Sequence, residues 1–550
     1  ALSSRGIFHM KYGIAEDAMG DRVAFAGSLN ETSNGYSCNV EQFDVFKSWV
    51  AGEKEYEEHY FNEFESYWNG KSHGGTIIVD MPPGVLNTVS MAYNGYIGMK
   101  TKPMHQPIEL WEHQKSALSK WEENGMCGIV EMATGTGKTI MALNAALMAG
   151  KISGPLLVVI AVPTDSLRSQ WQHEAILNVS KRPLIINNSQ SIIALENEVK
   201  SMGRHSMAIA IGTYSILSNE KFLDFISGKI NCNCMLIADE VHGAGSPKNS
   251  SVLNPKFKFR LGISATPIRY MDEEGTNLIM DYFNGIVFSY STKEAIADGR
   301  IVPYGYFPIF SRLSLAEMDE YVALTKKYAK IAAGNKDNGT QTKNLKNILI
   351  ARAKILKKAS GKILEFKEIA RKLSNSSEDF HAIVFYEDKD QMKSGNEVLD
   401  SLLLKYYTFD SRNNTNEREG ALKMFKANNQ SFLCTIRAAD EGINIPEANV
   451  AIIFSETGNP RQGWQRLGRV LRKTPGKKVS SVYEISAMPE KNITSHAFEL
   501  EHSIATKEIK RMCILCSSAE NMYESAKSLA LYGNEFDINV WKYLNEIMHL

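Results

Sequence analysis

The sequence lacks several features that would assign it to a class of protein at once. Its 550 residues contain no run of about 18 apolar residues, so we expect no segment that spans a membrane. Neither sign of charge is in excess, because 62 Lys and Arg residues balance 62 Asp and Glu residues. Such a balance argues neither for nor against a nucleic-acid partner, since a local basic path is hidden in the total. Apolar residues make up 43% of the chain, which is enough for packed cores.

Cysteine is scarce as well. The chain has seven cysteines, which is an odd number, and they are scattered over 550 residues. This predicts reduced thiols and a cytoplasmic protein. The pairs Cys232/Cys234 and Cys513/Cys516 have spacings that suggest zinc, but neither has a second matched pair, so core or loop positions are favoured. No signal peptide is recognisable. Because the chain opens without an initiator Met, we expect residues to precede it in the intact protein.

Two series of apolar, strand-like runs alternate with helical periodicity. The first extends from Ile108 to about Arg300 and includes CGIVEM, PLLVVIAV, MAIAIGTY, CMLIADE and FRLGISAT. The second begins near His381 and includes HAIVFYE, YYTFDS, SFLCTI, VAIIFSE and VSSVYEIS. Continuous apolar strands separated by helices are typical of buried parallel sheets. The sequence therefore predicts an α/β protein with two parallel-sheet lobes.

The length predicts three or four domains at about 150 residues each. The segments outside the two lobes are a strand-rich front end, a Gly- and Pro-rich stretch, a Lys-rich helical stretch and a helical tail. The predicted organisation is a partial domain at 1–72, a linker at 73–107, a first lobe at 108–302, a helical connector at 303–376, a second lobe at 377–490 and a helical extension at 491–550.

A glycine-rich motif, MATGTGKT at 132–139, stands between a predicted strand and a predicted helix. Glycines let the backbone N–H groups converge on a polyphosphate, Lys138 would reach its β- and γ-phosphates, and Thr139 would hold Mg²⁺. The alternative is a Gly-rich turn without a ligand, which the strand–loop–helix context disfavours. The expected nucleotide-binding residues are Thr134, Gly135, Thr136, Gly137, Lys138 and Thr139.

An acidic pair follows at the end of another apolar run, in the motif ADEVH. The carboxyl ends of parallel strands are where open α/β sheets place catalytic carboxylates. Asp239 would bind Mg²⁺, and Glu240 would position or deprotonate the attacking water. A solvated turn is the alternative, but the position about a hundred residues beyond the phosphate loop argues against it.

Together these motifs resemble the superfamily 2 helicases of the DEAH/DEVH type, over about residues 103 to 490. That resemblance implies two RecA-like lobes, ATP and Mg²⁺ as cofactors, and nucleic acid as substrate. It places Gln114, in LWEHQ, on the adenine. It assigns VPTDSLRSQW (162–171) and GTYSIL (212–217) to the nucleic-acid backbone, and SATP (264–267) to coupling hydrolysis with domain movement.

Two further motifs of that family occur in the second lobe. RAADEGINIP (437–446) resembles the motif that contacts both nucleotide and strand, which implies that Asp440 and Gly442 lie near the nucleotide. QRLGRVLR (465–472) resembles the arginine-finger motif, which implies that Gln465 lies beside the nucleotide and that Arg469 and Arg472 contact the γ-phosphate. ATP would then complete a site across the cleft between the lobes, and hydrolysis would drive directed motion.

The front end, GIFHMKYGIAEDAMGDRVAFAGSLN at 6–30, resembles the phospholipase D-like nucleases. By that resemblance His9 is the nucleophile, Lys11 and Asn30 stabilise charge on the phosphoryl oxygens, and Glu41 completes the motif without a metal. The family's aspartate position falls on Glu16 here, and the hairpin that follows is longer than in simple members. The single copy of the motif requires a second histidine, from residues upstream or from a homodimer partner. A relic kept for DNA binding or dimerisation is the alternative.

The sequence thus predicts an ATP-dependent DNA helicase or translocase with a phospholipase D-like nuclease segment. Proteins of this combination resemble bacterial restriction and phage-defence effectors. The DEVH type and the fused nuclease favour DNA, single-stranded or tailed, over RNA. Two alternatives remain open: an RNA helicase with a relic front end, and an ATP-gated clamp or sensor that recruits another effector.

Overall fold

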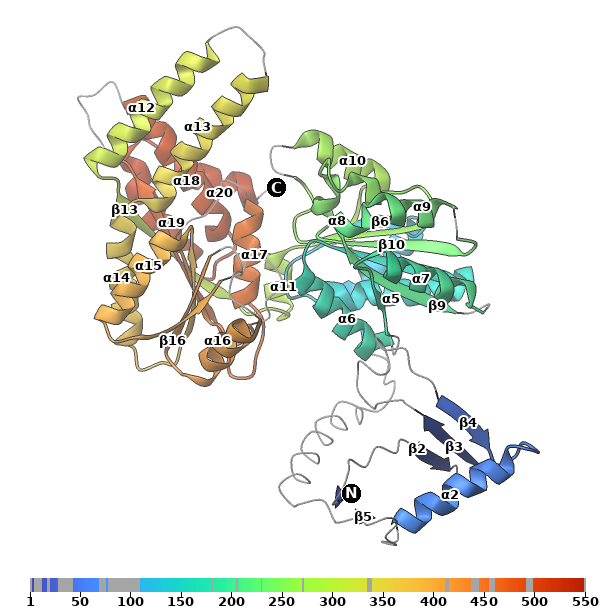
Figure 1. Ribbon diagram of the computed structural model, residues 1–550. Helices are drawn as coiled ribbons and strands as arrows, with labels where there is room; N and C mark the ends of the chain where they lie inside the picture. The colour runs from blue at the N-terminus through green and yellow to red at the C-terminus, as the bar shows by residue number, and fades with distance from the viewer. Residues whose placement is uncertain are drawn as a thin grey trace. The chain divides into compact units, whose positions relative to one another are not determined.

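The computed structural model describes two compact units of the chain, Ala1–Ile108 and Glu109–Leu550 (Figure 1). The residues that it describes are 2–3, 12–16, 20–27, 43–68, 76–77, 109–179, 182–203, 206–228, 230–269, 272–333, 339–410, 415–436, 445–454, 460–490 and 498–548.

The first unit contains an antiparallel sheet with one helix packed on it. The sheet has the order β2-β3-β4, and helix α2 (Lys54–Trp68) contacts all three strands. Glu57 of the helix is buried, and it pairs with Arg22 of β3 at 3.0 Å, which offsets the cost of burying its carboxylate. The predicted hairpin and acidic helix are therefore present. The strands of this unit are β1 (Leu2–Ser3), β2 (Tyr12–Glu16), β3 (Arg22–Gly27), β4 (Phe43–Lys47) and β5 (Thr76–Ile77), with β1 and β5 paired antiparallel.

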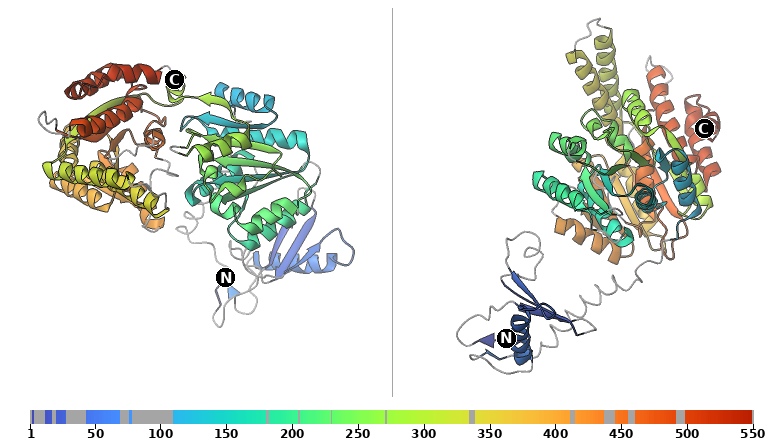
Figure 2. Two further views of the ribbon diagram at one scale, coloured as in Figure 1. Left: turned by 90° about the horizontal axis from the view of Figure 1, so that it is seen from above. Right: turned by 90° about the vertical axis from the view of Figure 1, so that its right-hand side faces the viewer.

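The first lobe of the second unit is built on a seven-stranded parallel sheet of order β12-β6-β11-β10-β7-β9-β8. Its strands are β6 (Cys127–Met132), β7 (Leu156–Val162), β8 (Leu184–Ile185), β9 (Met207–Thr213), β10 (Asn233–Asp239), β11 (Phe259–Ser264) and β12 (Ile286–Tyr290). Strands β7 and β9 are buried along their whole length, because helices cover both faces of the sheet (Figure 2).

Two helices of this lobe begin within a sequence motif. Helix α5 (Lys138–Ser153) follows the glycine-rich loop, and the short helix α8 (Tyr214–Leu217) lies within the 212–217 motif. The others are α4 (Glu112–Glu123), α6 (Asp165–Val179), α7 (Ser189–Lys200), α9 (Glu220–Gly228), α10 (Glu273–Phe283) and α11 (Thr292–Ala297), with 3₁₀ turns η1 (Val241–Gly245) and η2 (Ser250–Val252).

The second lobe is built on a six-stranded parallel sheet of order β13-β18-β17-β14-β16-β15. Its strands are β13 (Tyr304–Arg312), β14 (His381–Tyr386), β15 (Lys405–Phe409), β16 (Ser431–Ile436), β17 (Val450–Ile453) and β18 (Ser480–Met488). Helices α14 (Gly361–Ser374), α15 (Lys389–Ser401), α16 (Thr415–Ala427) and α17 (Pro460–Val470) complete it. The predicted α/β fold with two parallel-sheet lobes is confirmed.

The stretch 303–376 differs from the purely helical connector that we expected. Its first part is β13, which pairs with β18 along nine residues and forms an edge of the second sheet. Only then do α12 (Leu315–Ala332) and α13 (Gly339–Lys358) form a helical hairpin, which extends away from the sheet (Figure 1). The strand has the sequence YGYFPIFSR, and its Gly305 and Pro308 are residue types depleted in strands, which hides its strand character in the sequence.

The C-terminal helices α18 (Phe498–Cys516), α19 (Met522–Glu535) and α20 (Val540–Met548) pack on the second lobe. Asn521 accepts from the backbone N–H of Tyr306 at 2.7 Å and donates to its carbonyl oxygen at 3.0 Å, so its amide continues the pairing of edge strand β13. Cys513 and Cys516 are buried among these helices, and burial raises the pKa of each thiol to about 12. They are core residues.

Within the described residues, no group of three or more His, Cys, Asp or Glu side chains could hold a metal ion. Within the same ranges, none of the helices combines the length and apolar character needed to cross a membrane.

Candidate functional site

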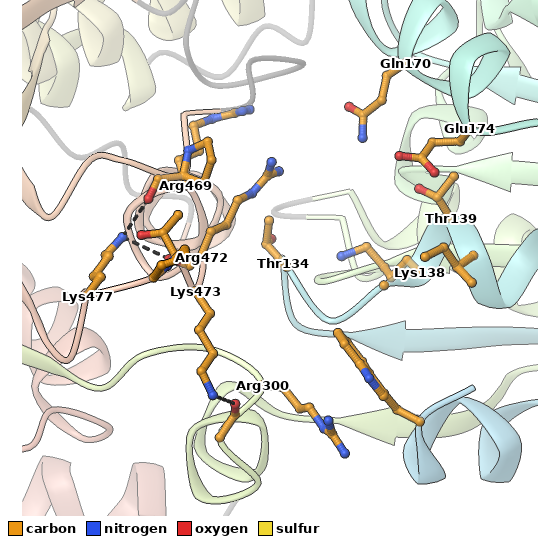
Figure 3. A pocket seen from close by; sticks show the side chains of 18 of the residues that line it. Thr134, Lys138, Thr139, Gln170, Glu174, Arg300, Arg469, Arg472, Lys473 and Lys477 are labelled. Atoms are coloured by element: carbon orange, nitrogen blue, oxygen red, sulfur yellow. Dashed lines mark hydrogen bonds between the residues drawn. The ribbon is translucent and has the colours of Figure 1, made fainter. Parts of the chain in front are cut away.

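A cavity of about 1010 Å³ lies within the second unit, where the two lobes face each other. Lobe one contributes the glycine-rich loop after β6 and the carboxylates after β10, and lobe two contributes the end of α17 and the loop after it. In Figure 3, Lys138 and Thr139 lie on one side of the cavity, and Arg469 and Arg472 lie on the other. Of the predicted site residues, those that line it are Thr134, Gly135, Gly137, Lys138, Thr139, Asp239, Glu240, Arg469 and Arg472.

The glycine-rich loop has a backbone conformation that L side chains rarely adopt. Gly135 and Gly137 have φ angles of +90° and +82°, and Gly137 is the N-cap of the 16-residue helix α5. The free N–H groups at this helix start form an anion site. Lys138 Nζ donates to the carbonyl oxygens of Met132 (3.0 Å) and Ala133 (3.2 Å). Burial lowers the pKa of this ammonium, although Glu240 and Asp239 raise it.

Gln114 hydrogen-bonds to the glycine-rich loop but is not among the residues that line the cavity. Its Nε2 donates to Gly137 O at 3.0 Å, and its Oε1 accepts from Trp111 N at 2.9 Å. His113 Nε2 lies 3.0 Å from Thr136 O. A methyl group at Gly137 would collide with the Gln114 amide, so only glycine fits there. The expected contact of Gln114 with a nucleobase stays a prediction.

Asp239 is the last residue of β10, Glu240 follows it, and both line the cavity. Asp239 is buried, and its oxygens accept from Trp171 Nε1 at 2.7 Å and from Glu240 N at 2.9 Å. Burial and the adjacent Glu240 charge raise the pKa of Asp239 to about 6, despite these bonds. Glu240 itself has a φ of +47°, which is unusual for a residue with a side chain. The two adjacent carboxylates would attract a cation.

Two more motif residues contact Glu240. Ser264 Oγ, at the start of the 264–267 motif, donates to Glu240 Oε2 at 3.0 Å. His242, from the ADEVH motif, is buried with Nδ1 at 3.4 Å from Ser264 Oγ and 3.5 Å from Glu240 Oε2. A change in the position or charge of Glu240 therefore acts directly on Ser264 of the 264–267 segment.

The residues present fit the Mg²⁺ that the resemblance implies. Thr139 supplies a hydroxyl and Asp239 a carboxylate at the same cavity, and burial together with the adjacent Glu240 charge raises the pKa of Asp239, which a bound cation would offset. Mg²⁺ is commonly bound by one or two carboxylates together with phosphate oxygens and water, not by a cage of protein ligands.

Lobe two meets the glycine-rich loop through α17. Gly468 packs so closely on Thr134 that a methyl group at Gly468 would collide with it. The next residue, Arg469, is buried and lines the cavity. Burial lowers the pKa of Arg472, whose guanidinium reaches the same space. The predicted arginine-finger residues and the predicted phosphate-binding residues are thus brought together.

Other predicted site residues cannot be placed. His9, Lys11, Asn30, Glu41, Asp440 and Gly442 lie outside the described residues, as does the side chain of Gln465. Their roles stay predictions.

Sequence reasoning missed several residues that line the cavity, among them Trp111, Arg300, Lys473 and Lys477. Arg300 lies over the ring of Trp111, with Cζ 4.7 Å from the ring centroid. Lys473 Nζ donates to Gly299 O at 3.2 Å, and Lys477 donates to three carbonyl oxygens. The signals were an aromatic residue three positions before Gln114 and the basic string KTPGKK directly after Arg472.

Comparison with known proteins identifies two domains. The type III restriction enzyme res subunit family matches residues 107–269, and the helicase conserved C-terminal domain matches 362–474. The chain is 26% identical over 389 residues to the DNA 3'-5' translocase XPB2 of Sulfurisphaera tokodaii, which covers 66% of this chain and 79% of that protein. It is 26% identical over 377 residues to the putative DNA 3'-5' helicase Rad25 of Haloarcula marismortui, covering 66% of this chain and 51% of that protein.

A solved structure shares the fold. The ATP-dependent type ISP restriction-modification enzyme LlaBIII, bound to DNA, aligns with a TM-score of 0.52 and 16% identity over 80% of this chain. The match covers 33% of that enzyme, so this chain spans about a third of its length.

Glu240→Gln is expected to raise the thermal stability of the nucleotide-free protein at pH 8. Asp239 titrates near pH 6 when folded and near about 3.9 when unfolded. Its ionisation therefore opposes folding above that range, and this penalty is absent below about pH 4. Removing the Glu240 charge reduces the penalty, so the gain in Tm should be largest at pH 8 and vanish near pH 4. Thermal melts across this range, without divalent metal, measure it.

Glu174→Gln is the matched control, since Glu174 is another carboxylate of the cavity. A gain in Tm that is equal at pH 4 and pH 8 would contradict the assigned cause.

Proposed function

From the superfamily 2 helicase domains that residues 107–269 and 362–474 carry, we propose that the chain is an ATP-dependent DNA helicase or translocase. One observation supports this most: a phosphate-binding loop, a carboxylate pair and two arginines from the other lobe line one cavity. Charge from both lobes would converge only on a ligand that spans them, and a nucleoside triphosphate has the required negative charge.

The residues divide the work of hydrolysis. The N–H groups of the loop and Lys138 bind the β- and γ-phosphates, and Thr139 and Asp239 hold Mg²⁺, which neutralises phosphate charge when bound. Glu240 orients the attacking water and accepts its proton. Arg469 and Arg472 stabilise the charge on the transferred phosphoryl group. Once the γ-phosphate leaves, the lobes lose a shared ligand and separate, which moves a bound strand by one step.

DNA as the substrate is supported by the relatives and by local charge. The relatives are described as DNA 3'-5' translocases or helicases. Helix α13 contains no acidic residue, and the acidic residues of α12 lie in its first half, so the far end of the hairpin is basic. Basic side chains on a projecting element suit contact with a phosphate backbone. Four exposed lysines that lie on this hairpin away from its base are Lys326, Lys327, Lys330 and Lys346.

Lys138→Ala and Glu240→Gln are both expected to abolish ATP hydrolysis without unfolding the protein. Lys138→Ala should also weaken nucleotide binding, because a cation that contacts phosphate is lost. Glu240→Gln should retain ATP, since only the group that acts on water changes. Phosphate release and nucleotide-binding assays test both. Normal turnover in either variant would refute the ATPase assignment.

ATPase activity is expected to rise with single-stranded or tailed DNA, with little sequence preference, because backbone contacts carry no base information. Affinity should fall with salt, with a slope of about −0.7 per phosphate contact on single strands. Replacing the four hairpin lysines by Ala should reduce this slope and the stimulation by DNA, while the basal rate stays unchanged.

Lys115→Ala with Lys120→Ala is the control, because these exposed lysines pair with glutamates of their own helix. A rate indifferent to DNA and salt would contradict the proposal. Strand displacement on RNA but not DNA would favour an RNA helicase, and stimulated turnover without displacement or translocation would favour a clamp.

For the front end we propose a metal-independent phosphodiesterase activity within a restriction or phage-defence system. Its support is the motif of His9, Lys11, Asn30 and Glu41 alone. His9 would attack phosphorus and form a phosphohistidine, a second histidine would protonate the leaving oxygen, and water would then release the phosphate. Because one histidine cannot serve in both roles in a single pass, a homodimer or further residues would supply the second.

His9→Ala is expected to eliminate DNA cleavage and leave ATPase activity unchanged. Cleavage by the wild type should survive EDTA, because no step uses a metal. Lys11→Ala should cost about 10²–10³ in rate through lost stabilisation of the oxyanion. Lys138→Ala serves as the reciprocal control and should still cut in an assay without ATP. A dimeric full-length protein that cuts no DNA, with or without ATP, would leave the front end a relic.

A further inference from the structure

Lys477 lies in the loop after α17, and its side chain donates hydrogen bonds to the protein's own backbone. Its Nζ donates to Pro446 O at 3.2 Å, Ala448 O at 2.5 Å and Arg472 O at 3.0 Å. An ammonium group has three N–H donors, so this set of oxygens accounts for all of them. Burial lowers the pKa of Lys477 to about 8, with Arg472 lowering it further and Glu447 raising it. Such a buried ammonium is tolerated because it is fully hydrogen-bonded.

These three oxygens belong to two functional segments. Pro446 ends the 437–446 motif, which is expected to contact both nucleotide and strand, and Ala448 follows it closely. Arg472 is one of the two arginines that reach the cavity. Lys477 bonds to the main chain of Arg472 and to the end of the 437–446 motif. It therefore fixes the position of the Arg472 backbone, from which the guanidinium extends, relative to that motif.

The other side of the same loop is held by lobe one. Ile301 and Arg472 form an antiparallel bridge, and Val302 N donates to Leu471 O at 2.9 Å. Lys473 Nζ adds a bond to Gly299 O at 3.2 Å. Residues 299–302 lead directly from the first lobe into β13 of the second. The main chain of Arg472 therefore lies between the segment that joins the lobes and the 437–446 motif.

We propose that Lys477 is a positioning residue for Arg472: it joins the main chain of this arginine to the end of the 437–446 motif. Arg472 then stays aligned with the γ-phosphate as the lobes open and close. Lys477 does not touch the nucleotide in this scheme. The inference rests on the proposed ATPase function and adds to it a residue outside the known motifs.

Lys477→Met tests this, because it keeps an apolar stem of similar length and removes the three donors. We expect kcat for ATP to fall about 10- to 100-fold, since a displacement of about 1 Å can cost that much. KM should stay within about threefold, because the phosphate loop that binds the ground state is unchanged. Combined with Arg472→Ala, the substitution should cause no further loss, since it acts through Arg472.

Lys362→Met is the matched control for a merely structural role. Lys362 is also buried in lobe two, and its Nζ donates to Phe454 O at 2.6 Å, but it does not line the cavity. This variant should lower Tm and leave kcat unchanged. Should Lys477→Met fail to fold, Lys477→Arg keeps the charge, but its planar donors cannot meet three oxygens around one point, so kcat should still fall.

The outcomes separate the two proposals. If the wild type hydrolyses ATP and Arg472→Ala does so at a reduced but measurable rate, the proposed function stands and Lys477→Met decides the inference. A Lys477→Met variant that loses only Tm, as Lys362→Met does, would overturn the positioning role. So would a loss in kcat that multiplies with that of Arg472→Ala. A wild type without ATPase activity would overturn the proposed function and the inference with it.

Discussion

The close contact between Gly468 and Thr134 is the constraint on which the site depends. Because residue 468 has no side chain, helix α17 of the second lobe lies directly on the glycine-rich loop of the first. That approach carries the neighbouring Arg469 into the same cavity as Lys138. With a larger residue at 468, the same arginine would be held away from the loop. The site is thus shaped by a missing side chain as much as by charged ones.

The charges of the cavity are balanced only in part by the protein itself. Asp239 and Glu240 stand side by side, and bonds from Trp171 and Ser264 hold them without neutralising them. Burial and, after it, the adjacent Glu240 charge raise the pKa of Asp239. Around them are cationic groups from both lobes, and Lys138 is bonded to its own loop. Charges of both signs thus line one cavity, as the proposed nucleotide with its cation requires.

The second lobe is held together by segments far apart in the chain. Strand β13 comes from the stretch between the lobes, and its free edge is covered by Asn521 and the C-terminal helices. The loop after α17 lies between the segment 299–302 and the 437–446 motif. The segment that joins the lobes is therefore bonded to the same backbone that carries Arg472.

Local sequence pattern was sufficient to predict much of the two lobes. Continuous apolar runs mark central parallel strands, and a motif at the end of such a run has its place set by the sheet, so the sites of Lys138, Asp239 and Glu240 were predictable. The motif order likewise placed Arg469 and Arg472 on a second lobe. None of this required knowledge of the strand order.

Only the tertiary structure decided the contacts between distant segments. Periodicity cannot show that residues 304–312 form an edge strand, because Gly305 and Pro308 interrupt the strand signal there. Nor can it show that Gln114 bonds to the glycine-rich loop, or that Lys477 meets the carbonyl oxygens of Pro446 and Arg472. Sequence by itself determined which residues stand at strand ends, since that is a local property. Which of them meet depends on packing across the whole fold, and a backbone oxygen leaves no trace in the identity of its residue.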